Sequence, residues 1–341
     1  MNATEVSARV LSSTRLRESL FGRFRAEPRT DAYRLIHADA DGFPGLHVDA
    51  YAGYLVLNVA RPGAIEAAPA LEEALSAALD PLGIIRKLRH EEQGRGKVKD
   101  SVTSGKAPPD TLAVKEDGIP FQVELRGGFH TGLFMDLRDE RRRLRGLAAG
   151  RKVLNTFAYT GAFSVAAALG GAEEVTTVDV VAKAIDRAQR NFRLSGIDPE
   201  KHRFARMDTL EYLRMAGRRG WSFGAIVLDP PTFAAYRGGT WSAKTGYTEL
   251  LGLAIPLLER GGLLWAIANT EGLPSERFEG ALAKSFAAAK REARTLAMGG
   301  LPPDYPTPVG RESVHLKKEL TDPTRPVTVR LGAGRGIPEV S

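Results

Sequence analysis

The sequence predicts an α/β fold in which a parallel, doubly wound sheet follows a smaller N-terminal α+β part. Strand-like and helix-like segments alternate after residue 150, an order typical of a parallel sheet covered by helices on both faces. Before it, residues 32–60 group several strand-like segments, and residues 64–80 follow with a helical pattern. Hydrophobic residues make up 43% of the 341 positions, which is enough for a buried core.

We expect three parts along the chain: an arginine-rich helical lead at residues 1–30, a central α+β domain at 31–110, and a hairpin with the doubly wound domain at 111–341. Residues 86–109 are polar, basic and rich in Gly and Ser, so we predict a basic loop or linker there. Its cations either follow a phosphate backbone or simply face solvent.

The lead carries apolar residues at helical spacing, and we predict that Leu11, Leu16 and Leu20 form its buried stripe. It also carries six arginines, which form either a solvated helix face or a contact with nucleic acid. These arginines stand at positions 9, 15, 17, 23, 25 and 29.

Five segments in the first 125 residues have the composition of strands. They lie at residues 33–37, 46–49, 54–59, 112–115 and 120–125. The last two flank residues 116–118, Glu-Asp-Gly, which is a hairpin signal. From Asp136 the pattern predicts a helix with Leu137, Leu144 and Leu147 on its inner face.

The doubly wound part is predicted from five apolar strands with helices between them. The strands lie at residues 153–157, 175–179, 204–207, 224–229 and 263–268, and the helices at 161–169, 181–194, from 209 onward and at 246–259. Residues 291–333 are expected to add two further strands. Because ligands bind outside the carboxyl ends of parallel strands, the residues at those ends are the first candidates for a site.

Composition excludes several classes of chemistry. The chain has no cysteine, so it has no disulfide, no cysteine-based metal site and no thiol nucleophile of its own. Its six histidines include no close pair at ligand spacing, and we predict no metal site. No apolar run is long enough to span a bilayer and no signal peptide is evident, so we expect a soluble, cytoplasmic protein without membrane contact. A net charge of +7 and a pI of about 9.6 favour a polyanionic partner.

Small and acidic residues follow three consecutive strands. The turn at residues 158–164 lets a ligand approach a helix N-terminus, but it is not the GxGxxG of dinucleotide-binding proteins, so it favours a smaller nucleoside cofactor. Asp179 ends the second strand and suits the ribose hydroxyls, and Asp208 ends the third and suits an adenine amino group. Phe157 and Thr209 lie beside them as further candidates. A lone acid here is more often a helix cap, and the two together favour a ligand.

The fourth strand ends in Asp229-Pro230-Pro231-Thr232-Phe233. The two prolines fix the backbone as it leaves the sheet. The aspartate then presents acceptors for an exocyclic amino group or a ring N–H, and the phenylalanine can stack on a flipped base. The motif predicts that a nucleobase is the target.

Together these residues resemble the class I S-adenosylmethionine-dependent methyltransferases, and most closely the bacterial large-subunit rRNA methyltransferases built from PUA, central and methyltransferase domains. The resemblance covers roughly residues 30–335. It rests on YRLIHADADGFPGLHVD at 33–49, HTGLFMDLRDERR at 130–142, VLNTFAYTGAFSVAAALGGAEEVTTVD at 153–179 and DPPTF at 229–233.

The resemblance implies a Rossmann-like methyltransferase domain, S-adenosyl-L-methionine as the cofactor and RNA, specifically 23S rRNA, as the partner. It implies that Tyr159, Thr160 and Gly161 border the methionine part of the cofactor. It gives the two strand-end acids the ribose and adenine roles described above, and it implies that Asp136 and Arg138 close over the cofactor.

The sequence departs from the family in two respects. No segment corresponds to the N-terminal PUA-like module, so we expect a chain without it, and how RNA is recruited stays open. Relatives that make 5-methylcytosine carry Ser-Cys-Ser-Gly where this chain has Asn269-Thr270-Glu271-Gly272. Methylation of a pyrimidine carbon normally needs that thiolate. We therefore predict direct transfer to a base nitrogen, oriented by Asp229 and assisted by Asn269. The Asp-Pro-Pro-Thr-Phe motif together with Ala268-Asn269-Thr270 resembles relatives that methylate a guanine nitrogen, and this resemblance implies guanine as the base.

Three other interpretations stay open from sequence alone. They are cytosine-C5 methylation by a cysteine-free route, a non-catalytic RNA-binding or ribosome assembly factor on the same fold, and a nicotinamide-dependent oxidoreductase, which the missing GxGxxG disfavours. Whether the chain is a monomer or a homodimer is also open.

Overall fold

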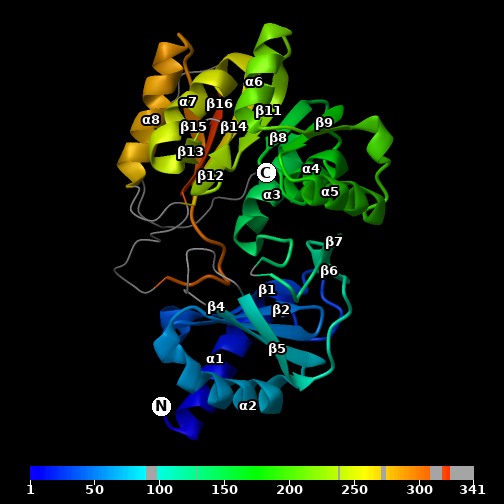
Figure 1. The fold of residues 1–341 in the computed structure, drawn as a ribbon, viewed down its shortest axis with the longest axis vertical. Helices are drawn as coiled ribbons and strands as arrows, with labels where there is room; N and C mark the ends of the chain where they lie inside the picture. Colours follow the sequence, from blue (N-terminus) through cyan, green and yellow to red (C-terminus); the bar gives the residue numbers. More distant parts are fainter. Residues whose placement is uncertain (90–97, 129, 237–238, 270–273, 308–316, 323–341) are drawn as a thin grey trace, which may run out of the picture.

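The computed structural model describes residues 1–89, 98–128, 130–236, 239–269, 274–307 and 317–322. A five-stranded and a seven-stranded sheet lie at opposite ends, with the β6–β7 hairpin between them (Figure 1). The predicted α/β class is confirmed. The described helices are α1 (Ala3–Phe21), α2 (Ala68–Leu79), α3 (Arg138–Leu147), α4 (Ala162–Leu169), α5 (Ala182–Leu194), α6 (Thr209–Arg218), α7 (Ala243–Ala254) and α8 (Ser275–Ala288). Within the described residues, no helix is long and apolar enough to cross a membrane.

The strands alternate with these helices in the second half of the chain. They are β1 (Ala32–His37), β2 (Leu46–Tyr51), β3 (Tyr54–Val59), β4 (Gly83–Arg89), β5 (Val98–Gly105), β6 (Leu112–Glu116), β7 (Ile119–Val123), β8 (Lys152–Thr156), β9 (Glu174–Asp179), β10 (Arg203–Arg206), β11 (Phe223–Leu228), β12 (Phe233–Tyr236), β13 (Gly239–Ser242), β14 (Leu258–Ala268), β15 (Arg294–Gly299) and β16 (Lys317–Asp322).

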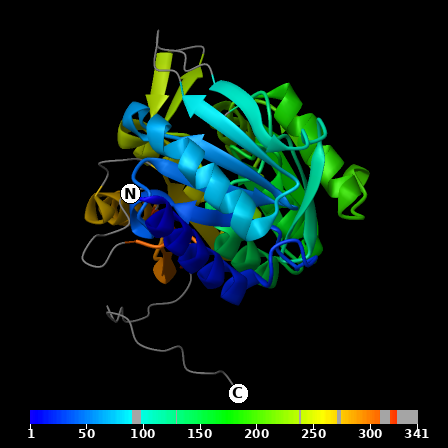
Figure 2. The same cartoon turned by 90° about the horizontal axis from the view of Figure 1, so that it is seen from below.

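The five-stranded sheet has the order β1-β2-β3-β4-β5 and is antiparallel except between β3 and β4. Those two strands are parallel because α2 lies between them in the chain and carries it back across the sheet. One face of the sheet, with Leu57 and Ile84, packs on Val10 of α1 and Leu71 of α2. Figure 2 shows the two helices across this face.

The lead forms α1 as expected, but the predicted buried stripe is wrong. Leu11, Leu16 and Leu20 are 39% to 45% exposed, whereas Val10 and Arg17 are buried. The inner face therefore includes a guanidinium, which hydrophobic periodicity assigns to solvent. A buried arginine is tolerated only when its charge is paired and its N–H groups are bonded.

Long-range ion pairs supply that pairing. Arg17 donates to both carboxylate oxygens of Asp41 at 2.7 Å and to the backbone carbonyl of Asp304 at 2.9 Å. Asp304 is fully buried and also accepts from the backbone N–H of Arg34 at 2.9 Å and from Arg138 at 3.0 Å. The segment after β15 is thus bound to α1, β1 and α3 at one point.

The predicted basic loop is wrong over most of its described length, because β4 and β5 run through it. Lys87 is buried and donates to the carbonyl of Gly128 at 2.6 Å, and Arg86 donates to Glu72 of α2 at 2.7 Å. Backbone ladder bonds do not depend on side-chain polarity, and long cationic side chains lay their stems along apolar surface, so a basic segment can still be a strand. Residues 90–97 of the predicted loop lie outside the described part.

The seven-stranded sheet has the order β10-β9-β8-β11-β14-β16-β15. The first five strands are parallel and β16 is antiparallel to both of its neighbours. The chain starts in the middle at β8, builds outward through β9 and β10, and then crosses to β11. The point where the strand order reverses lies between β8 and β11, and open α/β sheets bind their ligands there.

Both faces of this sheet are covered by helices. Ile226 and Leu228 of β11 pack toward α6, α7 and α8, whereas Ala225 and Val227 pack toward α3 and α4. This period of two with apolar residues on both sides explains why the strand reads as a continuous hydrophobic run. The hairpin β12–β13 and helix α8 were not predicted, and Leu147, predicted to face inward, is 40% exposed at the end of α3.

The two sheets share a core. The second face of the five-stranded sheet, with Val56 and Ile85, packs with Phe121 of the hairpin, with Met135, and with Phe192 of α5. The hairpin is therefore an apolar wedge between the N-terminal sheet and the helices of the larger sheet. It fixes the segment before α3 in place, and that segment borders the candidate site.

Candidate active site

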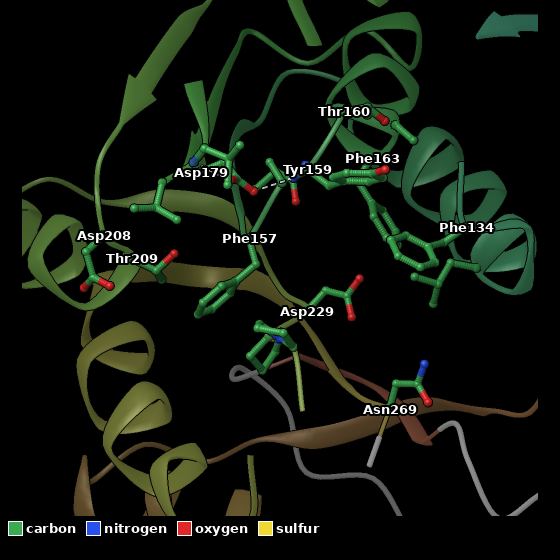
Figure 3. Close-up of a pocket in the computed structure, with 18 of the residues that line it drawn as sticks. Phe134, Phe157, Tyr159, Thr160, Phe163, Asp179, Asp208, Thr209, Asp229 and Asn269 are labelled. Carbon is green, nitrogen blue, oxygen red and sulfur yellow. Dashed lines mark hydrogen bonds between the residues drawn. The ribbon is translucent and has the colours of Figure 1, made fainter. Parts of the chain in front are cut away.

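A cavity of about 1140 Å³ opens at the carboxyl ends of β8, β9, β10 and β11, beside the reversal of strand order (Figure 3). It exceeds the roughly 300–1,000 Å³ of a typical small-molecule site, so it has room for more than one ligand group. Most of the predicted site residues line it, namely Asp136, Phe157, Tyr159, Thr160, Asp179, Asp208, Thr209, Asp229, Pro230, Pro231 and Asn269.

The turn after β8 is held in an unusual backbone conformation. Phe157, Tyr159 and Gly161 all have positive φ, at 52°, 50° and 75°. Left-handed conformations of non-glycine residues are costly and gather at functional sites, where surrounding bonds enforce them. Here the backbone N–H of Tyr159 donates to Asp179 Oδ2 at 2.7 Å, and that of Gly161 donates to the carbonyl of Ala158 at 2.8 Å.

Asp179 ends β9 with both carboxylate oxygens already engaged by backbone. Oδ2 accepts from Tyr159, and Oδ1 accepts from the N–H of Val181 at 2.9 Å. Each oxygen keeps a second lone pair, so the group can still accept bonds from two neighbouring hydroxyls. Val180 and Val181 are 62% and 53% exposed and line the same side of the cavity. A carboxylate beside exposed apolar side chains suits a sugar that carries an aromatic ring.

Asp208 and Thr209 lie where β10 passes into α6. Asp208 is the N-cap of that helix and accepts from the N–H of Glu211 at 3.1 Å. It also lines the cavity, so Asp208 caps a helix and is at the same time open to a ligand. The N–H of Met207 donates to the backbone carbonyl of Asp179, which fixes this strand end to the neighbouring one.

Asp229, Pro230 and Pro231 form the cavity wall at the end of β11. Thr232 donates from its hydroxyl to the backbone carbonyl of Asn269 at 2.6 Å, which joins the ends of β11 and β14. Figure 3 shows Asp229 and Asn269 together on one side of the cavity, apart from Asp208 and Thr209. The cavity therefore has two polar regions rather than one.

Of the remaining predicted residues, two do not line the cavity. Gly161 lies behind it at the start of α4, where an added Cβ would lie 2.7 Å from the Cβ of Ala188, so only glycine fits. Arg138 points away from the cavity and is buried against Asp304, so the expectation that it closes over the cofactor is wrong in this structure. The side chain of Phe233 lies outside the described part of the chain.

Sequence reasoning missed several residues that line the cavity, among them His130, Phe134 and Arg141. Arg141 is buried and donates to both oxygens of Glu116 at 2.7 and 2.6 Å and to the carbonyl of Phe134 at 2.8 Å. All three come from the segment at residues 130–142. The sequence motif of this segment could be identified, but no local pattern indicated which of its side chains face the cavity.

A buried polar cluster adjoins the cavity through Asn155, which lines it. Ser164 Oγ accepts from Asn155 Nδ2 at 2.9 Å and from Thr177 Oγ1 at 2.8 Å. Burial raises the pKa of Tyr159 above its ordinary value, so its phenol stays neutral at neutral pH. Polar groups that are bonded in this way hold the surrounding turns in a fixed geometry.

The arrangement can bind two groups side by side. One region offers carboxylates and exposed valines for a nucleoside, and the other offers the Asp229 region with Asn269 for a second polar molecule. Among the residues that the structure describes, no cluster of three or more His, Asp or Glu side chains could hold a metal ion. The two polar regions of the cavity favour transfer between two bound organic groups by alignment.

Comparisons with known proteins agree with this arrangement. Residues 50–296 match the family described as S-adenosylmethionine-dependent methyltransferase. A ribosomal RNA large subunit methyltransferase I from Cronobacter sakazakii is 35% identical over 283 residues, which cover 81% of this chain and 70% of that protein. A ribosomal RNA large subunit methyltransferase from Deinococcus radiodurans is 33% identical over 303 residues, covering 88% and 74%.

A solved structure extends the likeness to three dimensions. A methyltransferase crystallised as a complex with SAH superimposes with a TM-score of 0.86 at 28% identity, over 94% of this chain and 82% of the other. That structure holds the demethylated form of S-adenosylmethionine.

Proposed function

The chain belongs to the family of S-adenosylmethionine-dependent methyltransferases, and we propose that it methylates a nucleobase of RNA, namely a guanine nitrogen of large-subunit ribosomal RNA. S-adenosylmethionine is the cofactor of this family and supplies an electrophilic methyl group. The names of the relatives support ribosomal RNA as the substrate. The net charge of +7 supports a polyanion in general. A reaction on ribosomal RNA fits a location in the cytoplasm.

The residues of the cavity fit the cofactor. Asp179 has acceptor capacity left for the two ribose hydroxyls, and Val180 and Val181 offer apolar surface for the adenine ring. Asp208 would accept from the adenine amino group. The turn with Tyr159 would border the methionine part, because it lines the same cavity and is bonded through the Tyr159 N–H to Asp179 (Figure 3).

The observation that carries the proposal is the position of Asp229-Pro230-Pro231. The three residues end the strand at the reversal point and line the cavity on the side away from Asp208 and Thr209. The prolines hold the backbone, so the carboxylate and neighbouring carbonyls are fixed acceptors for an amino group or ring N–H of a base. Asn269 is tied to the same wall through Thr232 and can hold a second base atom.

The chemistry that follows is direct transfer. Asp229 would orient the base and accept from its N–H group, and a nitrogen of the base would attack the methyl carbon in line with the S–C bond that breaks. The electron pair of that bond would stay on sulfur, and a proton lost from the methylated nitrogen would pass to Asp229. Carbon-5 methylation of cytosine would need a nucleophile to add to the ring first, and the chain has no cysteine to do so. A nitrogen already carries the lone pair that the reaction needs.

A labelled methyl assay on unmodified large-subunit rRNA tests the proposal. Wild-type protein should transfer label, and Asp229→Ala should lower the rate by about 100-fold or more, because lost alignment costs about that much. Asp186→Asn, an exposed acid on α5 outside the cavity, is the matched control and should behave as wild type.

Mass spectrometry of the digested product identifies the methylated atom. Methylguanosine is expected. A 5-methylcytidine product would show a cysteine-free carbon route and contradict the nitrogen assignment. Binding of RNA without any transfer by wild type would instead favour an assembly factor.

A further inference from the structure

Phe134 is an exposed aromatic side chain on the wall of the cavity. It is 38% exposed, and among the described residues it is the one aromatic in the set of strongly exposed large apolar side chains. Its two neighbours in the chain, Leu133 and Met135, are 5% and 3% exposed. A single exposed apolar side chain is ordinary on a protein surface, but Phe134 lines the cavity, where aromatic side chains commonly contact a bound ligand.

The segment that carries Phe134 is held on several sides. The carbonyl of Phe134 accepts from Arg141, and Arg141 is itself fixed by two bonds to the buried Glu116 of the hairpin. Two residues earlier, the carbonyl of Gly132 accepts from the hydroxyl of Thr160 at 2.6 Å. The exposure of the ring is therefore a feature of a fixed backbone.

Within the described residues, two rings are recorded in contact with Phe134. His130 and Tyr159 approach it with centroid distances of 5.1 and 5.4 Å, and their planes are tilted by 55° and 50°. Neither contact is face to face. The three aromatic side chains thus form a rim, on which a further flat ring can stack.

The position of this rim separates it from the adenosine region. Asp208 and Thr209 lie on one side of the cavity, whereas Phe134 lies on the other, toward Asn269 (Figure 3). The adenine ring already has apolar surface in Val180 and Val181. A flat group that reaches Phe134 must therefore be a second ring, next to the Asp229 region.

We propose that Phe134 is the stacking surface for the flipped target base. This inference rests on the proposed function and names the residue that receives the substrate ring. Stacking on an aromatic side chain is available to any base, so Phe134 contributes to affinity for the extruded nucleotide, while Asp229 and Asn269 select among bases by hydrogen bonding.

Substitutions at Phe134 separate a stacking role from simple apolar cover. Stacking on one aromatic side chain is worth about 1–3 kcal/mol per base, so Phe134→Ala should lower kcat/KM for unmodified large-subunit rRNA by about 5- to 150-fold. Phe134→Leu keeps an apolar side chain without a ring and should also lose activity. Phe134→Tyr and Phe134→Trp keep the ring and should stay within about threefold of wild type.

The affinity for S-adenosylmethionine, measured by calorimetry, provides the second readout. It should be unchanged in the Phe134 variants and weakened by Val181→Ala on the adenosine side. Thermal unfolding of each variant checks that the protein is still folded under the assay conditions. Equal activity of Phe134→Leu and wild type would overturn the proposal, and so would a loss of cofactor affinity that matches the loss of rate. If wild type transfers no methyl group to RNA, the proposed function fails first and the base site fails with it.

Discussion

Two histidines of the N-terminal sheet predict a specific sensitivity to acid. Arg34 in β1 contacts Nδ1 of His37 at 3.0 Å and Nδ1 of His47 at 2.8 Å, and it also donates to Asp49. A guanidinium can only donate, so both Nδ1 atoms accept and both rings are neutral with the proton on Nε2. Protonation of either ring would place a second positive charge against the same arginine.

The pKa values give the sign and the size of the effect. Burial, and then the charge of Arg34, lowers the pKa of His37 to about 4 and that of His47 to about 3, from an ordinary value of 6.5. Between pH 6.5 and 4 the unfolded chain takes up protons on these rings and the folded chain does not. The free energy of unfolding therefore falls as the pH falls through this window, by about 2 kcal/mol per histidine at pH 5 relative to pH 8.

Urea unfolding at pH 8 and pH 5 measures this loss directly. Carboxylates also titrate in acid, so the informative quantity is the difference between wild type and a His47→Gln variant. The glutamine can still accept from Arg34 but does not titrate, so the variant should lose about 2 kcal/mol less than wild type between the two pH values. Parallel losses in both proteins would refute the neutral, arginine-bound state of His47.

Two further predictions concern the site. Asp179→Asn should weaken S-adenosylmethionine binding by about 10-fold or more, since a hydrogen bond to a charged acceptor is worth about 1.5–3 kcal/mol. An unchanged affinity, measured by calorimetry, would contradict this prediction. Gly161→Ala should lower the free energy of unfolding by about 2–4 kcal/mol, because it combines left-handed strain with a clash of its Cβ against Ala188. Gly196→Ala is the matched control, because the φ of Gly196 is +73° but nothing lies within 4 Å of the added Cβ. Urea unfolding should therefore show a loss of only about 1–2 kcal/mol in this variant. Equal losses of unfolding free energy in the two variants would show that the contact with Ala188 does not matter.

Parallel-sheet topology explains why much of the site could be predicted. Asp179, Asp208 and Asp229 are far apart in sequence, yet each ends a strand, and the ends of parallel strands meet at one edge. Locating the carboxyl ends of the strands in the sequence was therefore enough to predict that the three aspartates line one cavity. The β4–β5 pair escaped the same procedure, because charged residues such as Lys87 hide a strand whose ladder bonds do not involve side chains.

The errors around α3 show where local patterns stop being informative. Asp136 and Arg138 are two residues apart and were assigned to one side of the cofactor. The chain there enters a 3-10 turn and then α3, and residues two apart on a helix point to nearly opposite sides. Asp136 consequently lines the cavity, while Arg138 pairs with Asp304, which lies 166 positions later in the chain. A partner so distant in the chain cannot be predicted from a local stretch of sequence. The ion pair between Arg141 and Glu116, which holds the arginine that bonds to Phe134, cannot be predicted in that way either. The residues that sequence misassigned or missed here are thus the ones whose orientation depends on long-range charge pairs, and these pairs hold the wall against which we place the target base.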